Sequence, residues 1–242
     1  MPKDTRRSKS IRASYHGVMA ATIQTVETLR GPAGRLEALL DVGAADAAYS
    51  AVVCHPHPPS GGTMHTKVVY HAAKAFSHFG VPVLRFNFRG TGLSEGAHDN
   101  GPGEIADVKA ALDWLQQEFG LPILLAGFSF GANIGFRAAC GDERVKGLVG
   151  LGMPLSAGGR SYSYEFLSYC NQPKLLLTGA QDPFAPRIVM ESFFDEAAGD
   201  TEMQWIEGAE HFFAGVPGSP QTKLEPMRLT MQDWLGRKFF GQ

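Results

Sequence analysis

Two kinds of hydrophobic pattern alternate along this chain from about residue 21 onward. Short, nearly continuous apolar runs such as Ile123-Leu124-Leu125-Ala126 are typical of strands that are buried on both faces of a parallel sheet. Between these runs lie longer stretches, such as residues 105–119, in which apolar residues recur every three or four positions, as on one face of a helix. The alternation predicts an α/β fold, with a mostly parallel sheet flanked by helices.

The pattern also gives the positions of the individual elements. The first two strands are separated by the turn Gly31-Pro32-Ala33-Gly34, so we expect them to form an antiparallel hairpin. The expected strands are residues 21–29, 36–41, 49–54, 82–88, 121–126, 145–151, 174–178 and 203–206. The expected helices are residues 66–78, 105–119, 131–140, 187–198 and 224–240.

Residues 1–20 are polar and show no hydrophobic pattern, so we interpret them as a flexible tail, followed by a single α/β domain at residues 21–242. Within that domain, only residues 152–173 separate the sixth and seventh expected strands. This interval is too short for a cap of several helices, and residues 162–170 have room for one short helix. We therefore expect an open, lightly covered site.

Composition narrows the class of protein. Of the 242 residues, 44% are apolar and 19% charged, and the formal net charge is −2, which is an ordinary globular balance. The basic cluster between Lys3 and Arg12 has no interleaved aromatic residues, so we expect no nucleic-acid partner. No apolar run reaches the ~18 residues that span a bilayer, and no apolar core follows the basic start, so we expect a cytoplasmic protein with no membrane partner.

The chain has three cysteines, Cys54, Cys140 and Cys170, which are far apart and odd in number. They form neither a CxxC metal pair nor a regular disulfide framework. We therefore expect three free thiols, as in a reducing cytoplasm.

The strongest chemical signal is the segment Gly127-Phe128-Ser129-Phe130-Gly131, which follows a buried strand and precedes a helix of small residues. A serine hydroxyl is a poor nucleophile at neutral pH, so it has to be exposed beside a base. A sharp strand-to-helix turn presents the hydroxyl in this way, and glycines two positions before and after the serine prevent collisions. Such a pattern also arises by chance in a chain with 29 glycines, but its place after a buried strand favours Ser129 as a nucleophile.

An acid and a base follow Ser129 in the order that this kind of turn requires. Asp182 comes just after the seventh expected strand, at the carboxyl end where parallel strands form sites. His211 comes just after the eighth strand, and an imidazole can accept the serine proton and later donate it. The weaker candidates are Glu191 and Asp195 for the acid and His98 for the base.

An oxyanion hole needs N–H donors at the point where charge develops on the substrate oxygen. The main-chain N–H of Phe130, the residue after the nucleophile, is one expected donor. The other should come from loop 55–62, where proline has no N–H at three positions and the N–H of His57 is the natural choice. The fallbacks in the same loop are Ser60, Gly61 and Gly62.

A metal site is an alternative for this loop, because the imidazoles of His55 and His57 are close in sequence and His65 lies nearby. No acid completes the set at ligand spacing, and the side chain of Cys54 should point into the strand. We therefore expect no metal.

The glycine-rich segment 85–94 could cradle a phosphate, but it lacks the lysine ending of a P-loop. We interpret it as structural, shaping the floor of the site, with Arg89 buried against main-chain carbonyls.

With these residues identified, the sequence resembles the α/β-hydrolase superfamily, and most closely the small, lidless bacterial hydrolases related to dienelactone hydrolase. The resemblance rests on residues 55–58 with 61–64, 87–94 and 127–131, on Gly179 with Asp182, and on Gly208 with His211. It implies an α/β-hydrolase fold with a mostly parallel eight-stranded sheet and a minimal cap. It also implies that Ser129, Asp182 and His211 are a catalytic triad and that His57 and Phe130 supply the oxyanion hole.

Two departures limit what the resemblance implies. Dienelactone hydrolase uses a cysteine nucleophile, so the serine at position 129 argues against that particular activity. Many relatives also carry aspartate where this chain has Asn87, and a His-Gly pair where it has His55-Pro56.

We therefore expect a serine hydrolase that cleaves a small-molecule carboxylic ester or thioester through an acyl-serine intermediate, without a cofactor; a homodimer stays open. One alternative is a serine peptidase acting on short peptides or acyl-amino compounds, for which the sequence offers no residue that we can assign as a charged anchor. The other is a non-catalytic binding protein on the same fold. Five aromatic residues suit either an apolar acyl pocket or the core: Phe128, Phe130, Phe184, Phe212 and Phe213.

Overall fold

The computed structural model describes residues 22–218 and 221–242. The tail expected at residues 1–20 lies outside this part of the chain, as does the first residue of the first expected strand.

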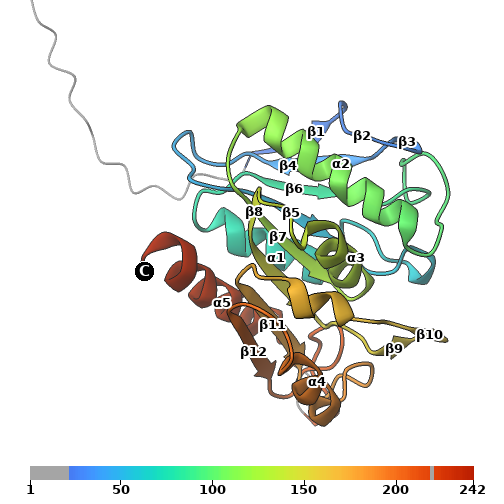
Figure 1. Ribbon diagram of the computed structural model, residues 1–242, viewed down its shortest axis with the longest axis vertical. Coiled ribbons are helices and arrows are strands. Elements are labelled where there is room, and N and C mark those ends of the chain that lie inside the picture. Colours follow the sequence, from blue (N-terminus) through green and yellow to red (C-terminus); the bar gives the residue numbers. More distant parts are fainter. Residues whose placement is uncertain (1–21, 219–220) are drawn as a thin grey trace, which may run out of the picture.

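Within the described residues, eight strands form one sheet in the order β1-β4-β6-β5-β7-β8-β11-β12 (Figure 1). The pairs β1–β4 and β4–β6 are antiparallel, and every other neighbouring pair is parallel. The strands are β1 (Ile23–Val26), β4 (Ala38–Asp41), β5 (Ser50–Cys54), β6 (Val83–Phe86), β7 (Ile123–Phe128), β8 (Val145–Leu151), β11 (Lys174–Gly179) and β12 (Thr201–Ile206). The mostly parallel eight-stranded sheet is therefore confirmed.

Helices cover both faces of the sheet (Figure 1). One face packs against α1 (Lys67–Ser77) and α5 (Leu224–Leu235), and the other packs against α2 (Pro102–Phe119) and α3 (Phe130–Ala139). The short helix α4 (Arg187–Phe194) connects β11 to β12, and a π-helical turn, η3 (Gly236–Phe240), continues α5.

The alternation of side chains along the central strands divides the core in two. In β7, Ile123 and Leu125 belong to the cluster under α2 and α3, whereas Leu124, Ala126 and Phe128 belong to the cluster under α1 and α5. Successive side chains of a strand point to opposite faces, so a continuously apolar run fills both clusters. This is why the buried strands could be recognised in the sequence.

Element boundaries differ from the expected ones in a few places. Strand β7 continues to Phe128, and the chain between β1 and β4 forms the small hairpin β2 (Arg30–Gly31) and β3 (Gly34–Arg35). The helix expected at residues 187–198 ends at Phe194, because the chain turns back at Gly199, whose φ is +74°, to enter β12.

The interval between β8 and β11 forms only a small cap. It contains a hairpin of β9 (Ser156–Ala157) and β10 (Arg160–Ser161) and one 3-10 turn, η2 (Glu165–Tyr169). Gly158 and Gly159 connect the two strands with φ values of +57° and +77°, as two-residue hairpins of the right-handed twist require. The single short helix was expected, whereas the hairpin, which projects from one side of the molecule (Figure 1), was not.

The expectation of three free thiols is wrong for two of them. Cys140 at the end of α3 and Cys170 after η2 form a disulfide, with Cα atoms 5.0 Å apart. Cys54 is free and buried in β5. Two cysteines separated by 30 positions give no local signal, because their pairing depends on how α3 and η2 pack. The argument for a reducing compartment loses its support.

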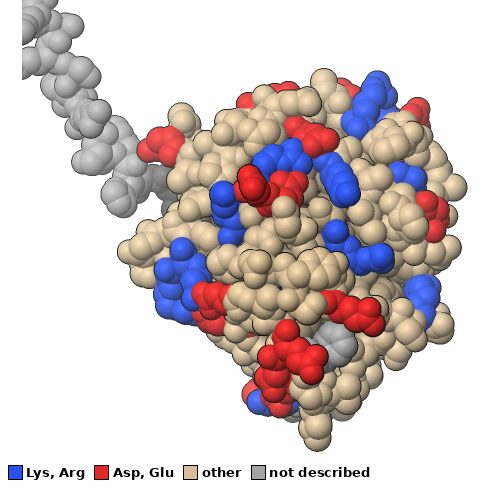
Figure 2. All heavy atoms as spheres, viewed as in Figure 1, with Lys and Arg blue, Asp and Glu red and all other residues tan. Residues whose placement is uncertain are grey.

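The side of the molecule shown in Figure 2 has no basic face. Acidic and basic side chains are interspersed on the side shown in Figure 2, and uncharged residues cover most of it. Within the described residues, no helix combines the length and the hydropathy that a bilayer span needs.

Reduction of the disulfide should lower stability measurably. The bond closes a loop of 30 residues, for which the chain-entropy model gives about 3–4 kcal/mol. We expect a reductant to lower the urea midpoint of the wild type but not that of Cys140→Ala/Cys170→Ala. Equal midpoints with and without reductant, in a wild type shown by mass spectrometry to be oxidised, would contradict this pairing.

Candidate active site

The chain makes a sharp turn at Ser129, between the end of β7 and the start of α3. Ser129 has φ +56° and ψ −121°, a backbone conformation that residues other than glycine rarely adopt. Its main-chain N–H donates to Leu151 O at 2.8 Å, which ties the turn to β8. The turn lifts the side chain of Ser129 above the carboxyl edge of the sheet, as the sequence motif predicts.

The two glycines of the motif allow this turn because each faces main-chain atoms. A Cβ atom at Gly127 would lie 2.4 Å from Gly131 O, and one at Gly131 would lie 2.3 Å from His55 O. Such distances are shorter than any real Cβ contact. Side chains at these positions would push α3 away from β5 and move Ser129.

Ser129, His211 and Asp182 form one chain of hydrogen bonds. His211 Nε2 lies 3.0 Å from Ser129 Oγ, and His211 Nδ1 lies 2.7 Å from Asp182 Oδ2. A carboxylate only accepts, so Nδ1 carries the proton and Nε2 is free to accept from the serine hydroxyl. Each of the three residues is at most 6% exposed, so little water competes for these bonds.

The loop after β11 holds Asp182 in place. The carboxylate accepts a second hydrogen bond at Oδ1 from the N–H of Phe184, at 2.8 Å. The N–H of Asp182 donates to Gly179 O at 3.0 Å, which closes a tight turn at the end of the strand. Asp182 is thus oriented by its own loop as well as by His211.

The loop after β12 holds His211 in a similar way. Oε1 of Glu210 accepts from the N–H groups of Phe212 and Ala214, each at 2.9 Å. The two site loops are also joined, because the N–H of Gln181 donates to Ala209 O at 3.0 Å. Glu210 is a positioning residue that the sequence analysis did not identify.

Three aromatic rings surround the imidazole of His211. The ring centres of Phe184, Phe128 and Phe212 lie 4.8, 5.0 and 5.3 Å from its own. The question about the aromatic residues therefore has a divided answer. Phe184 and Phe212 line the cavity beside Ser129, whereas Phe128 and Phe213 are fully buried in the core.

The two expected oxyanion donors are main-chain N–H groups near the turn at Ser129. The N–H of Phe130 is the first of α3, so it has no acceptor within the helix. Within the described residues, neither this N–H nor that of His57 donates to a protein atom. The ring centres of the two residues lie 5.4 Å apart, which places loop 55–62 directly against the start of α3.

The two histidines of loop 55–62 are neutral in the folded protein. Burial lowers the pKa of His55 to about 3, against a smaller opposing effect of its hydrogen bond to Pro56 O. Burial, with the charge of Arg160 and the neighbouring imidazole of His98, lowers the pKa of His57 to about 4.

Both ring nitrogens of His55 are already in use. Nδ1 donates to Pro56 O at 2.7 Å, and Nε2 accepts from the N–H of Phe88 at 3.0 Å. His55 thereby fastens loop 55–62 to the segment after β6. Within the described part of the chain, no group of three histidine, cysteine, aspartate or glutamate residues is arranged to hold a metal ion.

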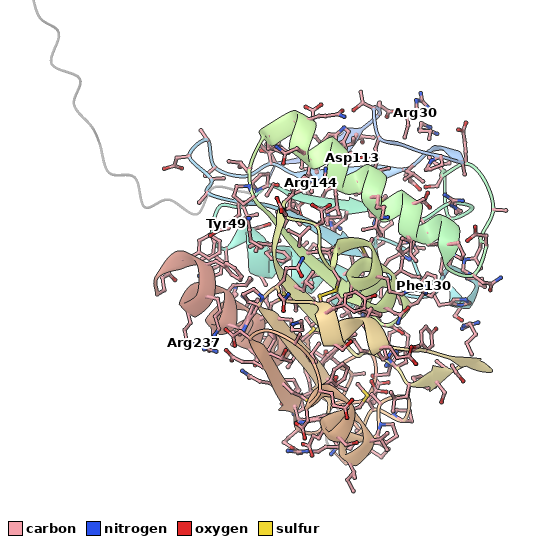
Figure 3. All side chains as sticks on the ribbon, viewed as in Figure 1. Arg30, Tyr49, Asp113, Phe130, Arg144 and Arg237 are labelled. Carbon is pink, nitrogen blue, oxygen red and sulfur yellow. A yellow bond between two sulfur atoms is a disulfide. The ribbon has the colours of Figure 1, made fainter. Side chains whose placement is uncertain are left out.

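A cavity of about 350 Å³ lies beside the hydrogen-bonded chain of Ser129, His211 and Asp182. Ser129, His211 and His57 line it together with Phe184 and Phe212. A second cavity of about 680 Å³ is lined by residues that include Phe130, whose place beside α3 is labelled in Figure 3. Arg160 and Tyr162 line both cavities.

The weaker candidates from the sequence lie elsewhere. His98 packs against His57 and Phe130, with Nδ1 2.8 Å from Glu104 Oε1, and does not line the cavity around Ser129. Glu191 and Asp195 are exposed on or just after α4, and Glu191 pairs with Arg187.

The expectation for Arg89 is wrong in its partner. Its guanidinium binds the buried carboxylate of Asp107, with Nε 3.0 Å from Oδ2 and Nη2 2.8 Å from Oδ1. A buried charge needs a counter-charge more than it needs carbonyls. Asp107 lies within α2 and is buried, and the sequence analysis did not identify it.

Comparison with known proteins gives a consistent family. Residues 50–235 match the family described as an alpha/beta hydrolase domain. An uncharacterized protein of Rickettsia prowazekii (strain Madrid E) is 36% identical over 190 residues, which cover 76% of this chain and 79% of that protein.

Two solved structures are similar over almost the whole chain. An alpha-beta serine hydrolase homologue from Coxiella burnetii is 34% identical, with a TM-score of 0.75 over 92% of this chain and 100% of the other. A serine hydrolase without a lid from Xanthomonas campestris is 31% identical, with a TM-score of 0.73 over 90% of this chain and 95% of the other.

A Cβ atom added at position 131, where the main chain of His55 approaches closely, tests this explanation of the turn. We expect Gly131→Ala to lower the free energy of unfolding by about 2–4 kcal/mol, since the new Cβ has to displace the main chain at His55. In Gly236→Ala, where the nearest atom would lie 3.4 Å away in a helical turn, stability should change by less than about 1 kcal/mol. Urea unfolding measures both. Equal effects of the two substitutions would contradict this explanation of the motif.

The neutral histidines should make the fold sensitive to mild acid. The unfolded chain protonates His55 and His57 near pH 6.5, whereas the folded pKa values are about 3 and 4. The contribution of the two histidines to the free energy of unfolding is therefore full well above pH 6.5. It falls as the pH decreases, by about 2 kcal/mol between pH 6.5 and 5.5 for the two groups together.

Urea unfolding at several pH values measures this loss. His57→Gln should reduce the loss by about half, and the exposed-site control His78→Gln should leave it unchanged. A free energy of unfolding that stays constant from pH 7.5 to 5.5 would contradict the neutral state of the two buried rings.

Proposed function

The chain belongs to the α/β-hydrolase family, and we propose that it is a serine esterase or thioesterase that acts through an acyl-serine intermediate. One observation carries this proposal: Ser129, His211 and Asp182, from three loops at one edge of the sheet, are joined by hydrogen bonds of 3.0 and 2.7 Å. A hydroxyl, a base and an orienting acid in this order are the parts that acyl transfer needs.

In the first half of the proposed reaction, Ser129 Oγ attacks the carbonyl carbon of the substrate. His211 Nε2 takes the hydroxyl proton, and the resulting imidazolium is stabilised by Asp182 at Nδ1. The negative charge that develops on the carbonyl oxygen is held by the N–H groups of Phe130 and His57. His211 then gives its proton to the departing alcohol or thiol, which leaves an ester on Ser129.

In the second half, a water molecule takes the place of the departed group. His211 Nε2 accepts a proton from this water as the water attacks the acyl-serine, and returns it to Ser129 Oγ. The same two N–H groups hold the second oxyanion. The acid product then leaves, and no cofactor takes part in either half.

The shape of the cavity favours a small substrate. A volume of about 350 Å³ lies at the lower end of the range for small-molecule sites. Phe184, Phe212 and Tyr162 supply apolar ring surface beside Ser129, which suits a short acyl chain or a small ring. The small cap leaves the cavity open to a substrate arriving from solution.

A substrate panel tests the reaction class. We expect hydrolysis of 4-nitrophenyl acetate and butyrate and of a short acyl thioester, with little cleavage of aminoacyl 4-nitroanilides. Cleavage of the anilides alone would favour a peptidase. If none of these compounds is turned over by folded protein, a binding protein on the same fold becomes the better explanation.

Substitutions in the hydrogen-bonded chain test the mechanism. Ser129→Ala should lower kcat by about 10⁴-fold or more, because it removes the nucleophile. Asp182→Asn should lower kcat by about 10⁴-fold, because it removes the carboxylate that orients His211. The matched control Ser192→Ala, at an exposed position on α4, should keep full activity. Melting temperatures of all variants should remain close to the wild type. Wild-type kcat in folded Ser129→Ala would exclude the proposed mechanism.

A further inference from the structure

Among the described residues, Arg160 in the small cap has no acidic partner, in contrast to the other arginines there that are not exposed. Within the described residues, the partly or fully buried arginines besides Arg160 each lie 2.7 to 3.4 Å from a carboxylate. These are Arg35, Arg85, Arg89, Arg144 and Arg228. The one side-chain hydrogen bond of Arg160 in the described structure runs from Nε to the hydroxyl of Tyr162, at 3.4 Å. Most of its N–H donors therefore have no protein acceptor.

The position of Arg160 is set by the β9–β10 hairpin. The Gly158-Gly159 turn folds β10 back onto β9, and Arg160 and Tyr162 line the same 350 Å³ cavity as Ser129 and His211. The charge of Arg160 also reaches the oxyanion loop, since it helps to lower the pKa of His57.

The charges around this cavity point to a monoanionic ligand group. Arg160 is the sole lysine or arginine among the described residues that line it, and no aspartate or glutamate lines it. The imidazole of His57 is neutral at working pH. One positive charge with a planar fork of N–H donors matches one carboxylate, which accepts two parallel hydrogen bonds from a guanidinium.

We propose that Arg160 binds a carboxylate of the substrate, so that the natural substrate is an ester or thioester that carries a free carboxylate besides the bond that Ser129 attacks. The inference rests on the proposed hydrolase function and narrows its substrate class. Binding this carboxylate fixes one end of the substrate while the carbonyl lies against Ser129. Because the arginine lies in the cap and outside the hydrogen-bonded chain, it acts on substrate selection.

Two pairs of esters test the proposal. In the first pair the charge is on the acyl part: mono-4-nitrophenyl adipate and its methyl ester. In the second pair the charge is on the leaving group: 4-carboxyphenyl butyrate and its methyl ester. We expect the wild type to prefer the charged member of at least one pair by about tenfold or more in kcat/KM, with most of the difference in KM.

Substitution of Arg160 should remove that preference. Arg160→Gln should lower kcat/KM for the charged member at least about tenfold more than for its neutral partner. Added salt should lower the wild-type kcat/KM for the charged member alone. Arg160→Lys should retain part of the preference, because it keeps the charge and loses the fork. The matched control is Arg137→Gln. Arg137 is exposed on α3 and lines the neighbouring 680 Å³ cavity but not the one around Ser129, so the preference should persist.

The possible failures are distinguishable. If the wild type hydrolyses the neutral esters and shows no preference in either pair, the carboxylate proposal is wrong and the hydrolase function stands. If Arg160→Gln weakens charged and neutral members equally, Arg160 only supports the cap and the proposal is also wrong. If the wild type hydrolyses no ester, the proposed function fails and the proposal fails with it.

Discussion

The backbone turn at Ser129 is the constraint on which the rest of the site depends. A residue with φ +56° and ψ −121° costs of order 1–3 kcal/mol, so the surrounding structure has to hold it. The hydrogen bond from Ser129 N–H to Leu151 O and the contact of Gly131 with the end of β5 do so. The same turn starts α3 without a preceding helical residue, which leaves the N–H of Phe130 free. One local strain therefore presents the hydroxyl together with the N–H that we propose as an oxyanion donor.

The parallel sheet brings the other two groups to this turn. Strands β7, β8, β11 and β12 run in one direction, so their carboxyl ends open onto one edge. Asp182 follows β11 and His211 follows β12. A Cβ atom at Gly179 would lie only 2.5 Å from Ala209 O, so the two loops pack main chain against main chain. This packing fixes the imidazole more firmly than side-chain contacts alone would. The rings of Phe128, Phe184 and Phe212 complete its environment.

The sequence was informative where the physics is local. Continuous apolar runs identified the strands, and the order Ser129, Asp182, His211 along them identified the residues that the fold brings together. It was uninformative where a partner is distant. The Cys140–Cys170 disulfide, the Arg89–Asp107 pair and the orientation of Arg160 depend on the packing of segments 18 to 30 positions apart or on a hairpin of two-residue strands. Asn87 shows the same limit: its side chain donates to Glu37 Oε2 at 2.7 Å, 50 positions away, where an aspartate would repel the glutamate.

The central claim is that the hydroxyl of Ser129 is activated by His211 in the folded protein. A fluorophosphonate probe, which phosphonylates activated serines, tests this claim when the adduct is located by peptide mass spectrometry. We predict one adduct per chain, on Ser129, that does not form in urea-unfolded protein and forms much more slowly in folded His211→Asn. An absence of adduct on folded wild type, an adduct on another residue, or an undiminished rate in His211→Asn would contradict it.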